Sequence, residues 1–161
     1  MKKLVTLLLT VALVLSMTVG VFAEEPSAQV NQVDEALKAE IKALVEQIKS
    51  MNEQIKVLRD EAAAKRDTIK ELVQLAKEAE ETEKLEAAKG YREQLKAVQA
   101  EIKSLRASKD EVRLMVKAAR EEGDFEEVKT GLIQIIEYKN QIISKINERM
   151  VLLDELIAVL Q

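Results

Sequence analysis

Carboxylates are plentiful in this sequence, and they are the side chains here that are best suited to metal binding or to paired acid–base chemistry. The 161 residues include 29 aspartates and glutamates but no histidine and no cysteine. Four of the acids crowd one short segment where their oxygens could hold a hard cation: Glu78, Glu80, Glu81 and Glu83. Calcium loops need a defined ligand spacing and a glycine, and this segment has neither. We therefore expect a solvated helix end rather than a metal site.

The missing residue types exclude several classes of enzyme. Without histidine and cysteine the chain cannot form cysteine-protease sites, thiol redox motifs, conventional zinc sites or the Glu-x-x-His di-iron motif of helical bundles. It also lacks a glycine-rich phosphate loop and a dinucleotide fingerprint. A paired-carboxylate hydrolase stays open by residue type, but a rod of convex helices offers no obvious cleft. We expect a protein without enzymatic activity, cofactor or bound metal.

The C-terminal segment is the best candidate for an interaction surface. Residues 150–160 are apolar on nearly all sides, whereas the segment expected beside them, residues 76–90, is rich in alanine, glutamate and lysine. We do not expect such neighbours to cover the apolar side chains, and exposed patches of this kind mark surfaces that bind proteins or membranes. The candidate residues are Ile136, Ile143, Met150, Leu152, Leu156, Ile157, Val159 and Leu160.

Residues 1–23 have the pattern of a cleaved signal peptide, which predicts an extracytoplasmic protein. Lys2 and Lys3 precede an uncharged apolar run, and Val21 and Ala23 supply the small residues of a cleavage site. An uncleaved anchor is the alternative, because the run is nearly long enough to span a bilayer. The absence of cysteine excludes a lipoprotein. Cleavage would remove two of the 25 basic residues and none of the 29 acids, leaving an acidic mature chain.

Apolar residues recur in steps of three and four along most of the remaining chain, which predicts long helices. We place them at about residues 35–79, 82–121 and 124–160, after a flexible lead-in at 24–34 that contains the single proline. The third helix has three adjacent apolar rows, so it can contact two helices at once. The expected fold is all-α: an elongated antiparallel three-helix bundle, or coiled coil, after a cleaved signal peptide.

The second helix–helix turn has the clearest local signal. Gly123 can adopt the left-handed conformation that ends a helix, and Asp124 can cap the next one. Glu127 lies at the capping-box position, three residues after the cap. We therefore expect a tight turn at Gly123 and Asp124.

The first turn is placed near residues 78–82. Apolar density falls there, Thr82 can act as a cap, and an internal match at an offset of 43 residues sets this segment against the second turn. Lysine- and glutamate-rich helices also resemble one another by composition alone, so the match is open to that explanation. Breaks at Arg59–Thr68 or at Ser108 are the alternatives, and the unbroken heptad phase through both argues against them.

An exported, cysteine-free, all-helical chain of this size resembles the periplasmic Spy/CpxP-type helical chaperones in architecture only. Their Leu-Thr-x-x-Gln signature is missing, since Leu-Thr occurs once, at Leu9 and Thr10 inside the leader. The resemblance therefore gives no residue of this chain a role.

These observations predict an exported protein that acts by protein–protein interaction, as a self-associating structural or adaptor coiled coil. The alternative is an ATP-independent envelope chaperone that binds unfolded or membrane-active clients through the same surface. Association with a membrane surface through the C-terminal segment is a weaker third interpretation. Nucleic acid is not an expected partner, because basic residues are interleaved with a larger number of acids and aromatic residues make up only 2% of the chain.

Overall fold

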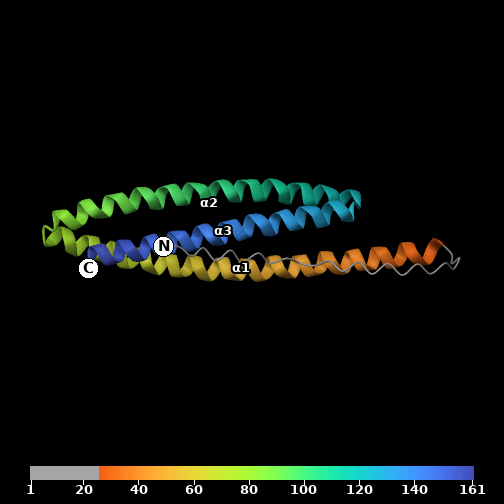
Figure 1. Ribbon diagram of the computed structural model, residues 1–161, viewed down its shortest axis with the longest axis horizontal. Coiled ribbons are helices and arrows are strands. Elements are labelled where there is room, and N and C mark those ends of the chain that lie inside the picture. The colour runs from red at the N-terminus through yellow and green to blue at the C-terminus, as the bar shows by residue number, and fades with distance from the viewer. Residues whose placement is uncertain (1–25) are drawn as a thin grey trace, which may run out of the picture.

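The computed structural model describes residues 26–161, and within them it contains three α-helices and no strand (Figure 1). The helices are α1 (Pro26–Glu78), α2 (Thr82–Glu122) and α3 (Phe125–Leu160). The prediction of an all-α fold with three helices is confirmed. The predicted signal peptide, residues 1–23, lies outside the described residues.

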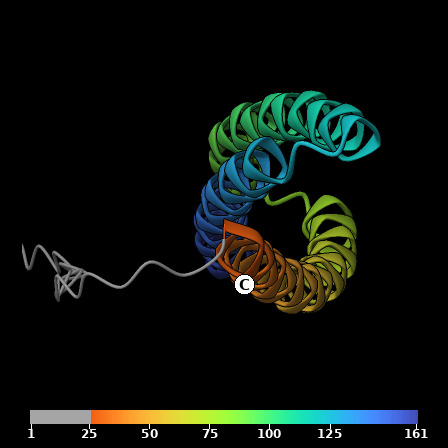
Figure 2. The same cartoon turned by 90° about the vertical axis from the view of Figure 1, so that its right-hand side faces the viewer.

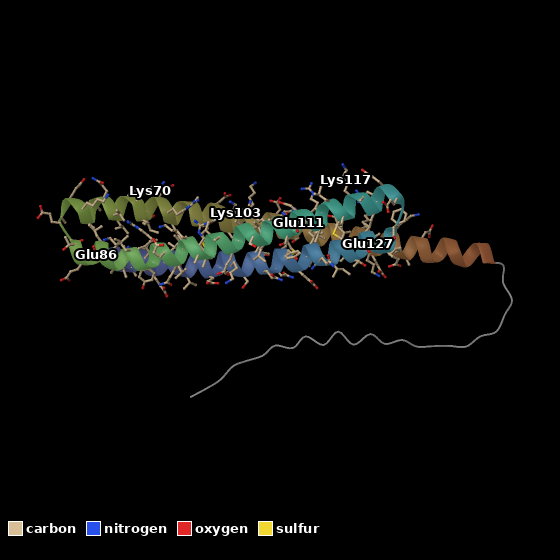
Figure 3. All side chains as sticks on the ribbon, turned by 90° about the horizontal axis from the view of Figure 1, so that it is seen from above. Lys70, Glu86, Lys103, Glu111, Lys117 and Glu127 are labelled. Atoms are coloured by element: carbon tan, nitrogen blue, oxygen red, sulfur yellow. The ribbon has the colours of Figure 1, made fainter. Side chains whose placement is uncertain are left out.

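α1 starts earlier than the sequence pattern predicts. It begins at Pro26, so residues 26–34 are helical rather than a flexible lead-in. Proline suits the first position of a helix, because its φ is already helical and its missing N–H would have no partner there. After Pro26, α1 contains no further proline and no glycine, so no residue of its sequence is expected to interrupt the helix. The start of α1 consequently projects past the start of α3 (Figure 3).

α3 is the central helix of the rod, with α2 on one side and α1 on the other (Figure 1). α1 and α3 run in the same direction, since Glu40 pairs with Lys129 at 2.5 Å near one end and Lys65 pairs with Asp154 near the other. α2 runs against both. The broad apolar face of α3 is therefore used as expected, because it packs against two helices along its length.

The first turn has a left-handed residue that is not glycine. Glu80 has a φ of 54°, and the Glu81 N–H donates to the carbonyl oxygen of Ala76 at 2.9 Å, which closes the end of α1. Thr82 does not cap α2: the residue before the helix is Glu81, and its side chain makes no capping hydrogen bond. The alternative break sites at Arg59–Thr68 and Ser108 lie inside α1 and α2.

The second turn uses the residues that the sequence indicates. Gly123 has a φ of 79°, and the Asp124 side chain accepts a hydrogen bond of 2.9 Å from the Glu127 N–H. The Asp124 N–H donates to the Ala119 carbonyl oxygen at 2.9 Å. Because the Asp124 N–H already has this backbone partner, the Glu127 side chain does not accept a hydrogen bond from it. The turn therefore has the Asp124 cap without the second hydrogen bond of a capping box.

α2 and α3 lie close together beside Gly131. A Cβ atom at this position would lie well inside van der Waals contact with the Val116 side chain. Gly131 is therefore a packing requirement of the α2–α3 interface, although glycine lowers helix propensity by about 1 kcal/mol relative to alanine.

Candidate binding groove

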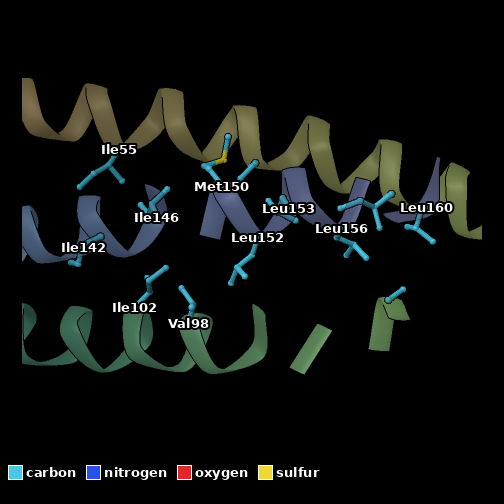
Figure 4. Packing of buried hydrophobic residues seen from close by; sticks show 13 residues of the cluster. Ile55, Val98, Ile102, Ile142, Ile146, Met150, Leu152, Leu153, Leu156 and Leu160 are labelled. Atoms are coloured by element: carbon cyan, nitrogen blue, oxygen red, sulfur yellow. The ribbon is translucent and has the colours of Figure 1, made fainter. Parts of the chain in front are cut away.

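The predicted interaction surface at the end of α3 is mostly core, which corrects the sequence-based expectation of an exposed patch. Five of its residues are less than a tenth exposed: Ile136, Met150, Leu152, Leu156 and Leu160. The other three, Ile143, Ile157 and Val159, are half-buried. Figure 4 shows Met150, Leu152, Leu156 and Leu160 between the ribbons of α1 and α2.

The alanines of the α1–α2 hairpin explain this burial. Ala76 is 1% exposed and Ala88 is 0% exposed. Small side chains on the outer helices let their backbones approach α3, so the large residues of α3 fill the space that remains. The alanine-rich segment covers the leucines because its side chains are small, which is the opposite of what the sequence pattern predicts.

The open surface lies elsewhere, where the two outer helices separate. α1 contacts α2 only sparsely, and the three helices form an open C when seen along the rod (Figure 2). Between α1 and α2, towards the Gly123 turn, is a groove of about 860 Å³ with α3 beneath it. We call this the basic groove, after the side chains described below.

The floor of the basic groove is apolar. Leu132 and Ile135 of α3 are buried at its base, and Val45, Ile48 and Val116 on the outer helices are only half-buried. Further along α1, where α3 packs against it fully, Ile55 and Ala62 are buried. The groove thus leaves apolar surface of α1 and α2 incompletely covered.

The rim of the groove is strongly basic. Six basic residues and one acid, Asp110, line the groove. Five of the basic residues lie on the outer helices, and the sixth, Lys139, lies on α3 beneath them: the five are Lys49, Lys109, Arg113, Lys117 and Arg120. Asp110 is already paired with Lys109 at 2.9 Å, and that hydrogen bond lowers the pKa of the Asp110 carboxyl. Arg113 and Arg120 make no ion pair within residues 35–161. Leu114 also reaches the rim and is 69% exposed.

Lys139 is the one charged side chain buried among the described residues, at 6% exposed. Its Nζ donates a hydrogen bond to the Asn52 side-chain oxygen, and no carboxylate pairs with it. Burial lowers the pKa of Lys139, and the nearby positive charges of Lys109 and Arg59 lower it further. A buried ammonium without a paired carboxylate is costly, so the charged form of Lys139 is disfavoured at this position.

Positive charge continues beyond the groove towards the middle of the rod. The Nε atoms of Arg106 and Arg149 are buried without a hydrogen-bond partner in the described part of the chain. Burial lowers the pKa of Arg106, and the charges of Arg59 and Arg149 add to this effect. Like charges from three helices therefore lie near one another here, and their mutual repulsion opposes a closer approach of α1 and α2.

The sequence carried a signal for this groove that the sequence-based prediction missed. On α2, basic residues recur with helical spacing beside the apolar seam: Arg106, Lys109, Arg113, Lys117 and Arg120. Steps of three and four place them along one face of a helix. Such a row looks like an ordinary solvated face until the structure shows that it borders a gap between helices.

The described residues offer little else that could form a functional site. No cluster of three or more metal-ligating side chains was found in this part of the chain, and none of its helices is long and apolar enough to cross a membrane. A smaller hollow of about 370 Å³ lies between α2 and α3, where Lys145 pairs with Glu101 at 2.6 Å and with Glu148 at 2.8 Å. Its charges are already matched.

Comparisons with protein-family models, with curated proteins and with solved structures found no match to this chain.

Proposed function

We propose that this protein is an exported, non-enzymatic coiled-coil adaptor that acts by protein–protein interaction, holding a helical segment of a partner in the basic groove. The observation that carries the proposal is the apolar floor that α1 and α2 leave open above α3. Half-buried apolar surface at the bottom of a groove is stabilised when a partner covers it.

The shape of the groove favours a helix as the bound segment. It runs between two helices and above a third, which is the position that a fourth helix occupies in a four-helix bundle. An amphipathic helix lying there would place its apolar side against Val45, Ile48 and Val116. The chain would then supply three helices of a bundle and the partner the fourth.

The chemical character of the groove supports binding rather than catalysis. Its polar side chains are ammonium and guanidinium groups with one carboxylate and one amide. The chain has no histidine or cysteine to act as a base or nucleophile near neutral pH. Such a set can hold negative charge in place.

Photocrosslinking in the producing cell tests the adaptor function. Benzoylphenylalanine replaces Leu114, which is 69% exposed at the groove rim, and in a control it replaces Leu75, which is 60% exposed near the other end of the rod. We expect a discrete product at position 114, with the attachment mapping to one helical segment of one partner, and no such product at position 75. Identical products at both positions, or none at 114, would refute the proposal.

An envelope chaperone is the second candidate function, because the same incompletely covered floor could bind many clients. A chaperone would give a spread of crosslinked clients at position 114 and would suppress aggregation of a chemically unfolded protein. An adaptor would give one product and leave aggregation unchanged. Export is tested separately by mass spectrometry of envelope protein, where we expect the chain to begin at Glu24, and an intact Met1 would contradict cleavage.

A further inference from the structure

We infer that the occupant of the basic groove is an acidic amphipathic helix of a partner protein, with carboxylates facing the rim and apolar residues facing the floor. This inference rests on the proposed function, and it adds the charge and the pattern of the partner.

The concentration of positive charge in the groove is local. The whole chain carries more acids than bases, 29 against 25, yet six bases and one acid line the groove. Three of the six bases already have a carboxylate partner, since Lys109 pairs with Asp110, Lys49 with Glu46 and Lys117 with Glu121. Arg113 and Arg120 have no ion pair within the described residues. A bound carboxylate would therefore meet unmatched charge, and complementary charges of this kind favour association and select the partner.

The spacing of the charges fits a helix. Lys109, Arg113, Lys117 and Arg120 follow one another at steps of four, four and three on α2. From Lys109 to Arg120 the row is roughly 16 Å long, at 1.5 Å per residue. Acids with the same helical spacing on a neighbouring helix would lie opposite this row. Lys49 on α1 lies at the opposite rim but is paired with Glu46 at 2.7 Å, so the unpaired charge of the groove lies on α2.

The apolar floor distinguishes a helix from a simple polyanion. A polyphosphate or nucleic acid would satisfy the rim, but its phosphates would gain nothing from Val45, Ile48 and Val116. An acidic amphipathic helix satisfies both parts of the groove, because one side carries carboxylates and the other buries apolar area.

Synthetic peptides test the inference with the whole mature chain from Glu24. Three labelled helices of about 21 residues, roughly 30 Å long, share one leucine seam and carry glutamate, glutamine or lysine at the flanking positions. Fluorescence anisotropy measures their affinity for the chain. We expect the glutamate peptide to bind about tenfold or more tightly than the other two, and to weaken as the salt concentration rises.

Charge reversal on α2 provides a matched pair of variants. Arg113→Glu with Lys117→Glu should weaken binding of the glutamate peptide by about tenfold or more. Arg92→Glu with Lys96→Glu makes the same change three heptads earlier on the same helix, outside the groove, and should leave affinity unchanged. All four side chains are exposed, so both variants should melt like the parent chain.

Several results would overturn the inference. If the glutamine peptide binds as tightly as the glutamate peptide, charge is not recognised. If inorganic polyphosphate binds more tightly than the glutamate peptide, the groove is a polyanion site. A second copy of the chain would be the occupant if the parent chain is a dimer, if the variant Arg113→Glu with Lys117→Glu is a monomer, and if the parent binds none of the peptides. A partner helix crosslinked at position 114, together with failure of the glutamate peptide, would refute this inference and leave the proposed function standing.

Discussion

Lys139 shows how a single residue shapes the basic groove. Its side chain is buried and donates a hydrogen bond to Asn52, and the positive charges of Lys109 and Arg59 lower its pKa while Asp110 opposes that effect. A protein that only needed stability would gain from an apolar side chain here, since replacing a buried charge with a hydrophobic residue is often neutral or stabilising. The lysine is explained if the groove must hold negative charge.

Lys139→Met is therefore expected to raise the free energy of unfolding by about 1 kcal/mol or more at neutral pH. The folded-state pKa of Lys139 is lowered, so the unfolded chain binds more protons between that pKa and the ordinary value. The parent chain thus gains stability as the pH rises through this window, and the advantage of the variant should shrink there. Urea unfolding at several pH values measures both effects.

Lys129→Met is the control for this prediction. Lys129 pairs with Glu40 at 2.5 Å, and that contact raises the pKa of Lys129. Its contribution is present below the ordinary lysine pKa and is lost as the pH rises through the raised one. The control should therefore be slightly less stable than the parent at neutral pH, and a parallel gain in both variants would contradict the argument.

The cap at Asp124 is a second residue whose effect can be measured alone. Asp124→Ala removes the hydrogen bond to the Glu127 N–H and should lower the free energy of unfolding by about 0.5–2 kcal/mol. Lys96→Ala removes an exposed ion pair with Glu93 on the surface of α2 and should cost little. Thermal melting that does not distinguish the two variants would mean that the cap is not used.

At the scale of helices, two glycines have opposite roles. Gly90 has open space around its Cα, so Gly90→Ala should stabilise the chain by about 0.4–1 kcal/mol through helix propensity. Gly131→Ala places a methyl group against Val116 and should destabilise the chain, because overpacking typically costs about 1–3 kcal/mol. Val116→Ala in the same chain should recover much of the loss. A stabilising Gly131→Ala measured by urea unfolding would refute the close approach of α2 and α3.

Helices and turns were largely predictable from this sequence, because their signals are local. The apolar periodicity indicates three helices, and Gly123 with Asp124 marks a turn by backbone preference and capping alone. The predicted start of α1 at about residue 35 is wrong, because Pro26 suits the first position of a helix and begins α1.

The candidate site was not predictable in the same way, because it depends on the distance between two helices. Ala76 and Ala88 were expected to leave the end of α3 bare, but small residues allow close approach and bury it. The basic row that includes Arg113 and Lys117 gains significance only when α1 lies across a gap from it. Periodicity identifies the faces of a helix, but the pairing of faces is set by tertiary packing.

At the scale of the whole molecule, the C-terminal end of α3 holds the rod together. Ile102, Leu153 and Leu156 are among its largest fully buried side chains, and they join α2 and α3 in the longer of the two core clusters. α1 reaches the same cluster through Ile55 and Ile69. Since α1 and α2 scarcely contact each other, they are held in place mainly by their separate packing against α3.

Replacing Ile157 and Leu160 with glutamate should therefore abolish the cooperative fold. Leu160 is 3% exposed and Ile157 packs against the same cluster. A fully buried aliphatic side chain such as Leu160 contributes about 1.5–3 kcal/mol, and carboxylates at one buried and one half-buried position would oppose folding further. Val151→Glu with Ala158→Glu introduces the same charges at exposed positions of α3 and should keep the parent melting curve. Circular dichroism measures folding and sedimentation measures self-association on the same samples. If the chain with Ile157→Glu and Leu160→Glu stays folded and loses only self-association, this end of α3 is an interface and not core.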